Sequence, residues 1–409
     1  MTNLPQGWEV KKLGEIGEIV TGSTPSKSNL DFYGKDYPFF KPSDFEQGYF
    51  LENAGDNLSK LGFDKARQLP PKTILVVCIG SLGKVALTRV IGSCNQQINA
   101  IIPHKNIIAE YIYYYCISSK FQSILFSKAP QTTLAILNKT EFSKLEIIYP
   151  KDIKEQERIV GILDESFAKI DESIKILEQN LLNLDELMQS ALQKAFNPLN
   201  DDTKENYQLP QGWEWKSLGG IGNTSSGGTP LRNKKEYWEN GSIKWLKSGE
   251  LNDGYVDFIE ENITEEAIEN SSAKIFQKGT LLIAMYGATA GRLGILNLDS
   301  ATNQAVCAFL HKDNKNIKFL EKFLFYFLFF IRDKIIKDSF GGAQPNISQT
   351  YIKNLQIPLP PLQEQEQIAK HLDFVFEKTK ALKELYTKEL KDYEELKQSL
   401  LDKAFKGEL

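Results

Sequence analysis

The chain contains 409 residues, of which 41% are hydrophobic and 25% are charged, and its net charge is −4. This composition is typical of an ordinary soluble protein. Proteins that bind duplex DNA are usually basic, so the net charge argues against DNA binding unless local patches or a basic partner neutralise the phosphates. The first residues, MTNLPQGWEV, lack the basic and apolar regions of a signal peptide.

The sequence argues against a membrane-spanning protein and against a metal-binding protein. The most apolar stretch, residues 323–331, is shorter than the roughly 20 residues that cross a bilayer, so we expect a buried helix. The four cysteines show no Cys-x-x-Cys spacing, which predicts reduced thiols, a cytoplasmic protein and no metal site. His104 and His311 occupy equivalent strand ends without a metal-spaced partner, and we interpret both as loop residues.

The dominant feature of the sequence is an internal duplication. Residues 4–25 read LPQGWEVKKLGEIGEIVTGSTP, and residues 209–230 read LPQGWEWKSLGGIGNTSSGGTP. Later landmarks recur in the same order: Glu-Gln-Glu at 155–157 returns at 364–366, and Lys-Ala-Phe at 194–196 returns at 403–405. A period this long predicts a tandem of two domains and not a solenoid. Two similar domains imply two similar partner surfaces.

Each repeat is expected to form a mixed α/β head followed by a long helix. The predicted boundaries are heads at residues 1–152 and 207–361, helices at 153–197 and 362–409, and a linker at 198–206. Within the heads, the apolar runs at 73–79 and 280–286 predict central strands that are buried on both faces. Helices are expected at about 109–126 and 316–337, and a last strand should end at Pro150 or Pro360.

The tails carry the strongest periodic signal. Apolar residues in the first tail recur at alternating steps of four and three for more than four heptads, which predicts a coiled coil. As one helix, residues 155–196 would be roughly 60 Å long. The predicted seam of the first helix is Leu163, Phe167, Ile170, Ile174, Leu177, Leu181, Leu184 and Met188. The less regular second seam is Leu372, Val375, Leu382, Tyr386, Leu390, Tyr393 and Leu400.

The connectivity of the repeats predicts that the two helices pair antiparallel. The first helix must deliver the chain to the second head, and the second helix then runs back toward the start. The predicted fold is therefore two α/β heads in tandem, separated by a long antiparallel two-helix coiled coil with pseudo-twofold symmetry. The alternative is that each helix packs flat on its own head.

No motif in the sequence indicates catalysis. The Pro-Pro pairs at 70–71 and 360–361 do not match the loop with which amino-methyltransferases hold a flipped base. Residues 80–84 lack the spacing of a phosphate-binding loop, and neither HExxH nor GxSxG occurs. We therefore predict no catalytic residue and no cofactor in this chain.

Both heads carry polar loops with the side chains that read DNA bases. Arginine and lysine pair with guanine, and asparagine and glutamine pair with adenine. The candidates in the first head are Thr21, Ser23, Thr24, Ser26, Lys27, Lys41, Ser43, Lys84, Asn95, Gln96 and Gln97. Those in the second head are Ser226, Thr229, Arg232, Lys247, Ser248, Arg292, Asn303, Gln304 and Gln344.

The duplication sorts these candidates into two groups. Positions that are the same in both heads, such as Thr24 and Thr229 or Gln96 and Gln304, cannot distinguish two half-sites, so we expect scaffold, phosphate or partner contacts. Positions that differ in matching loops are better candidates for base reading. They are Ser26, Lys27 and Asn29 against Arg232 and Asn233, Asp44 against Glu250, and Gln97 against Ala305.

These motifs together resemble the specificity subunit of Type I restriction–modification systems. The resemblance rests on LPxGWE and GxTP at the start of each head and on PLPPLQEQEQI at 358–368, of which the first copy keeps only Pro150 and Glu-Gln-Glu. It implies that each head reads one half of a split DNA target and that the helices set the spacer and dock partners. Those partners would be two DNA adenine methyltransferase subunits and restriction subunits, which would supply the chemistry of S-adenosylmethionine, ATP and Mg²⁺.

Two rival functions remain open from the sequence. One is a protein-only scaffold with two ligand-binding heads on a coiled-coil rod, which the acidic net charge slightly favours. The other is an enzyme whose motif is not recognisable.

Overall fold

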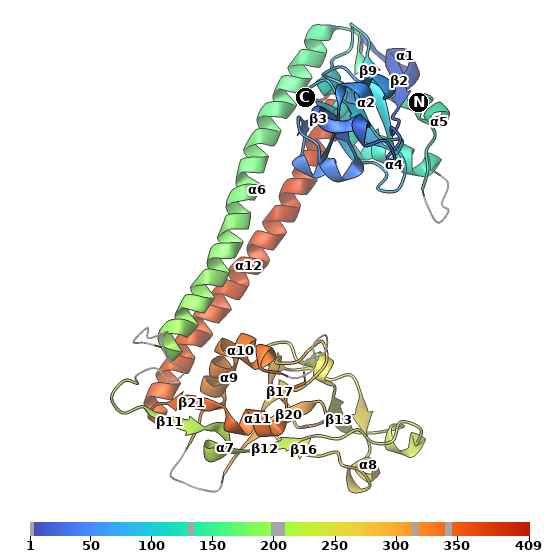
Figure 1. The fold of residues 1–409 in the computed structure, drawn as a ribbon. Helices are drawn as coiled ribbons and strands as arrows, with labels where there is room; N and C mark the ends of the chain where they lie inside the picture. The colour runs from blue at the N-terminus through green and yellow to red at the C-terminus, as the bar shows by residue number, and fades with distance from the viewer. Residues whose placement is uncertain (1–3, 130–134, 198–208, 313–317, 340–345) are drawn as a thin grey trace. The chain divides into compact units, whose positions relative to one another are not determined.

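A computed structural model describes residues 4–129, 135–197, 209–312, 318–339 and 346–409 (Figure 1). Its internal contacts divide the chain into two units, residues 1–178 with 386–409, and residues 179–385. The first unit contains head 1 (residues 4–152) and the second contains head 2 (residues 209–361). Each unit also contains parts of two long helices, α6 (Ile153–Phe196) and α12 (Leu362–Ala404).

A five-stranded sheet forms the centre of each head, and its strand order is the same in both. Head 1 has the order β2-β9-β6-β7-β4, and head 2 has β12-β20-β17-β18-β14, with only the last pair parallel in each. The bounds in head 1 are β2 (Gly17–Thr21), β4 (Phe50–Leu51), β6 (Ile74–Val77), β7 (Val85–Thr88) and β9 (Ile98–Pro103). Those in head 2 are β12 (Gly222–Ser226), β14 (Gly254–Val256), β17 (Leu281–Ala284), β18 (Leu293–Leu296) and β20 (Val306–His311).

The central strands are β6 and β17, and every residue of both is buried. Side chains alternate across a strand, so Ile74 and Val76 pack into one hydrophobic core while Leu75 and Val77 pack into another. In β17, Leu281 and Leu282 divide in the same way between two cores. The prediction of central strands buried on both faces is confirmed.

Smaller sheets complete each head. The first strand of each head, β1 or β11, pairs antiparallel with its last strand, β10 or β21. A further sheet has the order β5-β3-β8 in head 1 and β15-β13-β19-β16 in head 2. The bounds are β1 (Trp8–Lys12), β3 (Tyr33–Phe40), β5 (Asp56–Leu58), β8 (Ser93–Cys94), β10 (Glu146–Pro150), β11 (Glu214–Ser217), β13 (Ile243–Leu246), β15 (Asn262–Ile263), β16 (Ile275–Phe276), β19 (Ser300–Thr302) and β21 (Gln356–Leu359).

The single helices predicted at 109–126 and 316–337 are each two helices. In head 1, Ser118 ends α3 with extended backbone and its hydroxyl caps α4 by accepting from the amide of Phe121. In head 2 the break falls at Ile331. The bounds are α3 (Ala109–Ile117), α4 (Ser119–Lys128), α9 (Glu321–Phe330) and α10 (Arg332–Lys337). The prediction of a buried helix at 323–331 is confirmed for Phe323 to Leu328.

Short helices occupy the remaining connections of both heads. The α-helices are α1 (Leu13–Ile16), α2 (Lys60–Lys65), α5 (Lys139–Ser143), α7 (Leu218–Ile221), α8 (Glu265–Glu269) and α11 (Gln349–Asn354). The 3-10 helices are η1 (Leu30–Phe32), η2 (Pro42–Gln47), η3 (Lys235–Tyr237) and η4 (Ser248–Glu250).

The long helices pair antiparallel within each unit. In the first unit, Lys397 Nζ lies 2.6 Å from Asp171 Oδ1, and Arg158 donates to the carbonyl of Leu409 over 2.9 Å. In the second unit, Lys383 pairs with Asp185. Of the predicted seam residues, Leu163, Ile170, Leu177, Leu184 and Leu372 are buried, Phe167, Ile174, Leu181, Met188, Val375, Tyr386, Leu390, Tyr393 and Leu400 are half-buried, and Leu382 is 38% exposed.

All four cysteines are buried as free thiols. Burial raises the pKa of Cys78, Cys94 and Cys307 to about 12 each. No helix in the described part of the chain is long and apolar enough to cross a bilayer.

Candidate nucleic-acid interface

The polar loops of head 1 are joined to one another by side-chain and backbone hydrogen bonds. The hydroxyl of Thr24 donates to Gln96 Oε1 over 2.5 Å, and the amide of Ser23 donates to the carbonyl of Cys94 over 2.9 Å. Gly22 fits between these loops because it has no side chain, and a Cβ there would lie 2.1 Å from the carbonyl oxygen of Asn95. The sequence GSTP is therefore explained by a close approach of two loops.

Head 2 repeats the same construction. Thr229 donates to Gln304 Oε1, and the amide of Gly228 donates to the carbonyl of Thr302 over 2.9 Å. A Cβ on Gly227 would lie 2.1 Å from that carbonyl oxygen. The threonine and glutamine that both heads share therefore hold the loops together, which favours a scaffold role for this pair.

Two of the candidate lysines of head 1, Lys41 and Lys84, are paired with carboxylates. Lys41 pairs with Asp56, and Lys84 Nζ lies 2.7 Å from Glu46 Oε1. The Lys84 ammonium holds the pKa of the Glu46 carboxyl below its usual value. Three further candidates, Ser26, Lys27 and Ser43, are exposed.

The remaining head 1 candidates bond to neighbouring loop groups. Asn95 is buried and donates to Gln97 Oε1 over 2.9 Å, while Gln97 donates to the carbonyl of Ile79 over 3.4 Å. Thr21 donates to Asn99 Oδ1 over 2.7 Å. These bonds link four loops in a chain. The loop at 21–27 bonds the loop at 95–97, which bonds the turn at 79–84, and Lys84 of that turn pairs with Glu46 of the loop at 41–47.

Two of the three candidate cations of head 2 converge on one carboxylate. Arg232 donates to Glu261 Oε2 over 2.5 Å, and Lys247 donates to Glu261 Oε1 over 2.9 Å. Burial acts to raise the pKa of Glu261, but the two cations outweigh it and hold that pKa below its usual value. The Arg232 guanidinium also lies 3.8 Å from the ring centre of Trp238. Nothing in the sequence links Glu261 or Trp238 to Arg232, so neither residue was predicted to belong to this site.

Other candidates of head 2 are placed differently. Ser226 accepts a hydrogen bond from Gln349, Ser248 begins η4, and Asn303 accepts from the amide of Ala305 over 3.2 Å. Arg292 is exposed in the turn between β17 and β18. Gln344 lies outside the described residues.

Asp44 of head 1 and Glu250 of head 2, which occupy matching positions, have the same structural role. Asp44 accepts from the amides of Lys41 and Gly55 over 2.7 and 2.9 Å. Glu250 accepts from the amides of Lys247 and Glu260 over 2.7 and 3.1 Å. Both oxygens of each carboxylate therefore organise their own loop, which favours a structural role over base reading for this pair.

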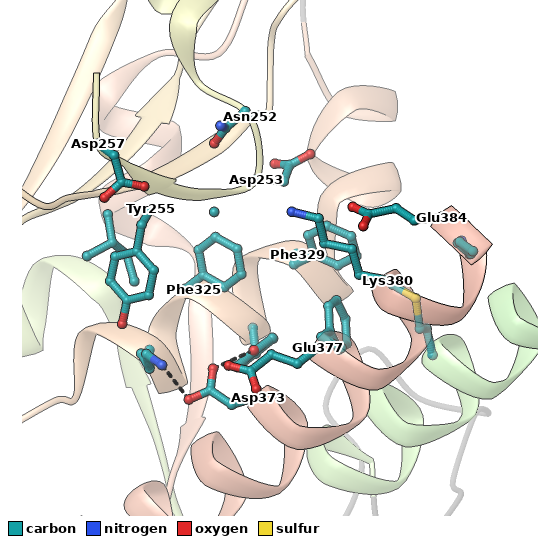
Figure 2. A pocket seen from close by; sticks show the side chains of 17 residues that line it. Asn252, Asp253, Tyr255, Asp257, Phe325, Phe329, Asp373, Glu377, Lys380 and Glu384 are labelled. Carbon is teal, nitrogen blue, oxygen red and sulfur yellow. Dashed lines mark hydrogen bonds and ion pairs between the residues drawn. The ribbon is translucent and has the colours of Figure 1, made fainter. Parts of the chain in front are cut away.

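Each unit has a cavity where the head meets the long helices. In head 2 its volume is 620 Å³, and Figure 2 shows Tyr255 and Asp257 on one side and Asp373 and Glu377 of α12 on the other. Tyr326 donates to Asp373 Oδ1 over 2.7 Å at its wall. The cavity of head 1, 770 Å³, has an equivalent bond from Tyr114 to Asp164 over 2.6 Å. Burial and the neighbouring carboxylate raise the pKa of both tyrosines.

The described residues contain no group of three or more histidine, cysteine or acidic side chains that could hold a metal ion. The polar loops offer hydrogen-bond donors and acceptors on the surface of each head. This chemistry suits recognition of a polar ligand such as base edges and phosphates.

Comparisons with known proteins place the chain in one family. The model of the Type I restriction modification DNA specificity domain matches residues 5–182 and again 210–392. The chain is 36% identical to the Type I restriction enzyme HindI specificity subunit of Haemophilus influenzae over 195 residues, which are 46% of this chain and 42% of that relative. It is 25% identical to the MjaIX specificity subunit of Methanocaldococcus jannaschii over 88% of this chain and 84% of the relative.

Solved structures have the same fold. A chain from a study of complex assembly and conformational transition of the type I R-M system aligns with a TM-score of 0.80 and 21% identity over 100% of both chains. The HsdS subunit from Thermoanaerobacter tengcongensis aligns with a TM-score of 0.60 and 22% identity, covering 100% of this chain and 98% of that one. The chain therefore belongs to the family of Type I restriction modification DNA specificity domains and carries two copies of that domain in tandem.

Proposed function

We propose that this chain is the DNA-recognition subunit of a Type I restriction–modification complex. Each head reads one half of a bipartite, asymmetric DNA target, and the long helices set the spacer and dock the methyltransferase subunits. The observation that carries this proposal is the duplication of one loop scaffold with different side chains on it. Thr24–Gln96 and Thr229–Gln304 hold equivalent loops, while the next position of the same loop is Gln97 in head 1 and Ala305 in head 2.

The chain itself is proposed to be non-catalytic. Two DNA adenine methyltransferase subunits and restriction subunits would supply the catalytic groups, and S-adenosylmethionine, ATP and Mg²⁺ would bind to those partners. The acidic net charge of −4 supports a division of labour in which basic partners neutralise most of the phosphates.

The proposal is tested by selecting duplexes from a random library with the full chain and its methyltransferase subunits. We expect two short conserved sequences separated by a spacer of fixed length but free sequence. The same selection with Arg232→Ala should relax preference in one half-site only, at a cost of about 1–3 kcal/mol for the affected base. Binding without sequence preference would favour the protein-only scaffold, and methyl transfer by the chain alone would show that it is an enzyme.

A further inference from the structure

Three of the contacts that attach each head to the long helices are the same in both units. The first is a glutamine in the first turns of the long helix. Gln156 is 0% exposed, accepts from the amide of Ile108 over 2.9 Å, and donates to the carbonyls of Asn106 and Pro150 over 3.3 and 2.9 Å. One buried amide therefore joins α6 to the start of α3 and to the end of β10.

Gln365 makes the same three bonds in the second unit. It is 1% exposed, accepts from the amide of Leu320 over 2.8 Å, and donates to the carbonyls of Lys318 and Pro360 over 3.2 and 2.9 Å. Gln156 and Gln365 are the central residues of the repeated Glu-Gln-Glu segment. A buried amide with this many partners is costly to replace, because each lost bond leaves a desolvated backbone group.

The second contact is the tyrosine–aspartate bond at the cavity wall. Tyr114 of α3 bonds Asp164 of α6, and Tyr326 of α9 bonds Asp373 of α12. In both units the aspartate lies eight residues beyond the glutamine, which is about 12 Å along the helix. An aromatic residue three positions further supports the tyrosine ring: the Phe167 centroid lies 5.3 Å from that of Tyr114, and the Phe376 centroid lies 4.9 Å from that of Tyr326.

The third contact comes from the other long helix. Phe405, just after the end of α12, packs edge-on against Tyr111 and Tyr115 of head 1, with centroids 5.5 and 5.0 Å apart. Phe196, at the end of α6, packs against Phe323 and Phe327 of head 2, with centroids 5.4 and 5.5 Å apart. These phenylalanines end the repeated Lys-Ala-Phe segment. The repeated Glu-Gln-Glu and Lys-Ala-Phe segments are therefore both explained by the three contacts between head and helices, which we call the joint.

We propose that these three contacts are positioning elements that fix the direction in which each head faces on its helices, and thereby determine the half-site spacing that the chain accepts. This inference rests on the proposed function. Two points on one helix and one on the other do not lie on a line, so together they prevent the head from pivoting about either helix. Residues of the same kind make the joint in both heads, while the polar loops differ.

The geometry of DNA makes a fixed joint necessary for a fixed spacer. Adding one base pair moves a half-site about 3.4 Å along the axis and turns it by about 35° around the axis. A head held at three points cannot follow that change without losing contacts. A head held at fewer points can pivot, and so can accept a spacer that is one base pair too long or too short.

The test compares variants that weaken one contact without a large change in volume; in the second unit Lys322 of α9 also pairs with Asp373, so there the tyrosine variant removes one of two bonds to that carboxylate. Tyr114→Phe combined with Tyr326→Phe deletes only two hydroxyl groups. Tyr351→Phe is a matched control, because it removes a hydroxyl–carboxylate bond to Asp338 of 2.9 Å that lies within head 2. Phe196→Leu combined with Phe405→Leu loosens the third contact independently.

Each variant is assembled with its methyltransferase subunits, and its affinity is measured for duplexes that carry the wild-type half-sites with spacers of the native length and one base pair longer or shorter, and for a duplex with scrambled half-sites. We expect the wild-type complex to prefer the native spacer by at least about tenfold, the size of effect that one wrong base pair produces. In both double variants this preference should fall below about threefold, with unchanged half-site sequences. Tyr351→Phe should keep the wild-type preference.

An unchanged spacer preference in both double variants, accompanied by a lower melting temperature, would overturn the inference and show that the contacts only stabilise the fold. A broadened preference in Tyr351→Phe would also overturn it, because general loosening of a head would then be the cause. If the wild-type complex shows no half-site preference at all, the proposed function fails, and that result is distinct from both of these.

Discussion

One carboxylate, Glu261, pairs with two of the candidate cations on the surface of head 2. Glu261 holds both Arg232 and Lys247, and the Arg232 side chain is still 52% exposed. Ion pairs with this exposure contribute only about 0–1 kcal/mol to stability. A phosphate group can therefore replace Glu261 as the partner of either cation at little cost. The carboxylate keeps the surface of the free head close to neutral and lowers its affinity for arbitrary DNA.

Replacing Glu261 with glutamine should strengthen non-specific DNA binding. The change removes the ion pair of Arg232 and leaves Lys247 with only its longer pair to Glu260, so the slope of log K against log salt concentration should steepen by about 0.9 for each new phosphate contact. Filter binding to unrelated duplexes over a series of salt concentrations measures this slope. Glu141→Gln is the control, since it breaks the 2.7 Å pair between Glu141 of α5 and Lys144 just after it in head 1, outside the polar loops. Equal slopes for Glu261→Gln and wild type would show that Glu261 does not restrain these cations.

At the scale of helices, the heptad pattern separates two adjacent residues of α6. Leu177 is 7% exposed, whereas Ile176 is 55% exposed. A charge at the first position must be buried between helices, and a charge at the second remains in water.

Leu177→Lys should therefore destabilise the first unit by about 2–5 kcal/mol, while Ile176→Lys should have almost no effect. Thermal unfolding followed by circular dichroism compares the two variants. Similar losses in both would contradict the assignment of Leu177 to the interface between α6 and α12.

The sequence predicted the long helices and central strands because their signals are local. The run at 74–77 is apolar throughout, and such a short apolar run is enough to predict a strand that is buried on both faces. The break at Ser118 was not predicted, since apolar residues continue on both sides and only the backbone conformation of Ser118 shows where α3 ends. The pairing of Arg232 with Glu261 depends on residues 29 positions apart that β13 and β15 bring together. No local pattern could reveal it.

At the scale of the whole molecule, duplication has preserved some features and changed others. The order of the central sheet, the loop scaffold and the three joint contacts are the same in both repeats. The side chains that the scaffold presents are different. A chain built in this way can alter one half of its target while the second half and the joints stay unchanged.

Lengthening both long helices should change the spacer alone. Inserting one heptad into α6 and one into the paired part of α12 preserves the seam and adds about 10.5 Å, which is about three base pairs. Selection from a random duplex library, performed with the methyltransferase subunits, should return the original half-sites with the longer spacer. Altered half-sites with the original spacer would contradict the assignment of the helices as spacer elements.

The buried cysteines make the local opening of each head measurable by chemical modification. Cys78, Cys94 and Cys116 belong to head 1, and Cys307 is the only cysteine of head 2. Because burial raises the pKa of these thiols and shields them from reagents, an alkylating pulse modifies a cysteine only when its surroundings open. Peptide mapping after brief pulses would therefore time the opening of the two halves separately, in the natural chain and without added labels.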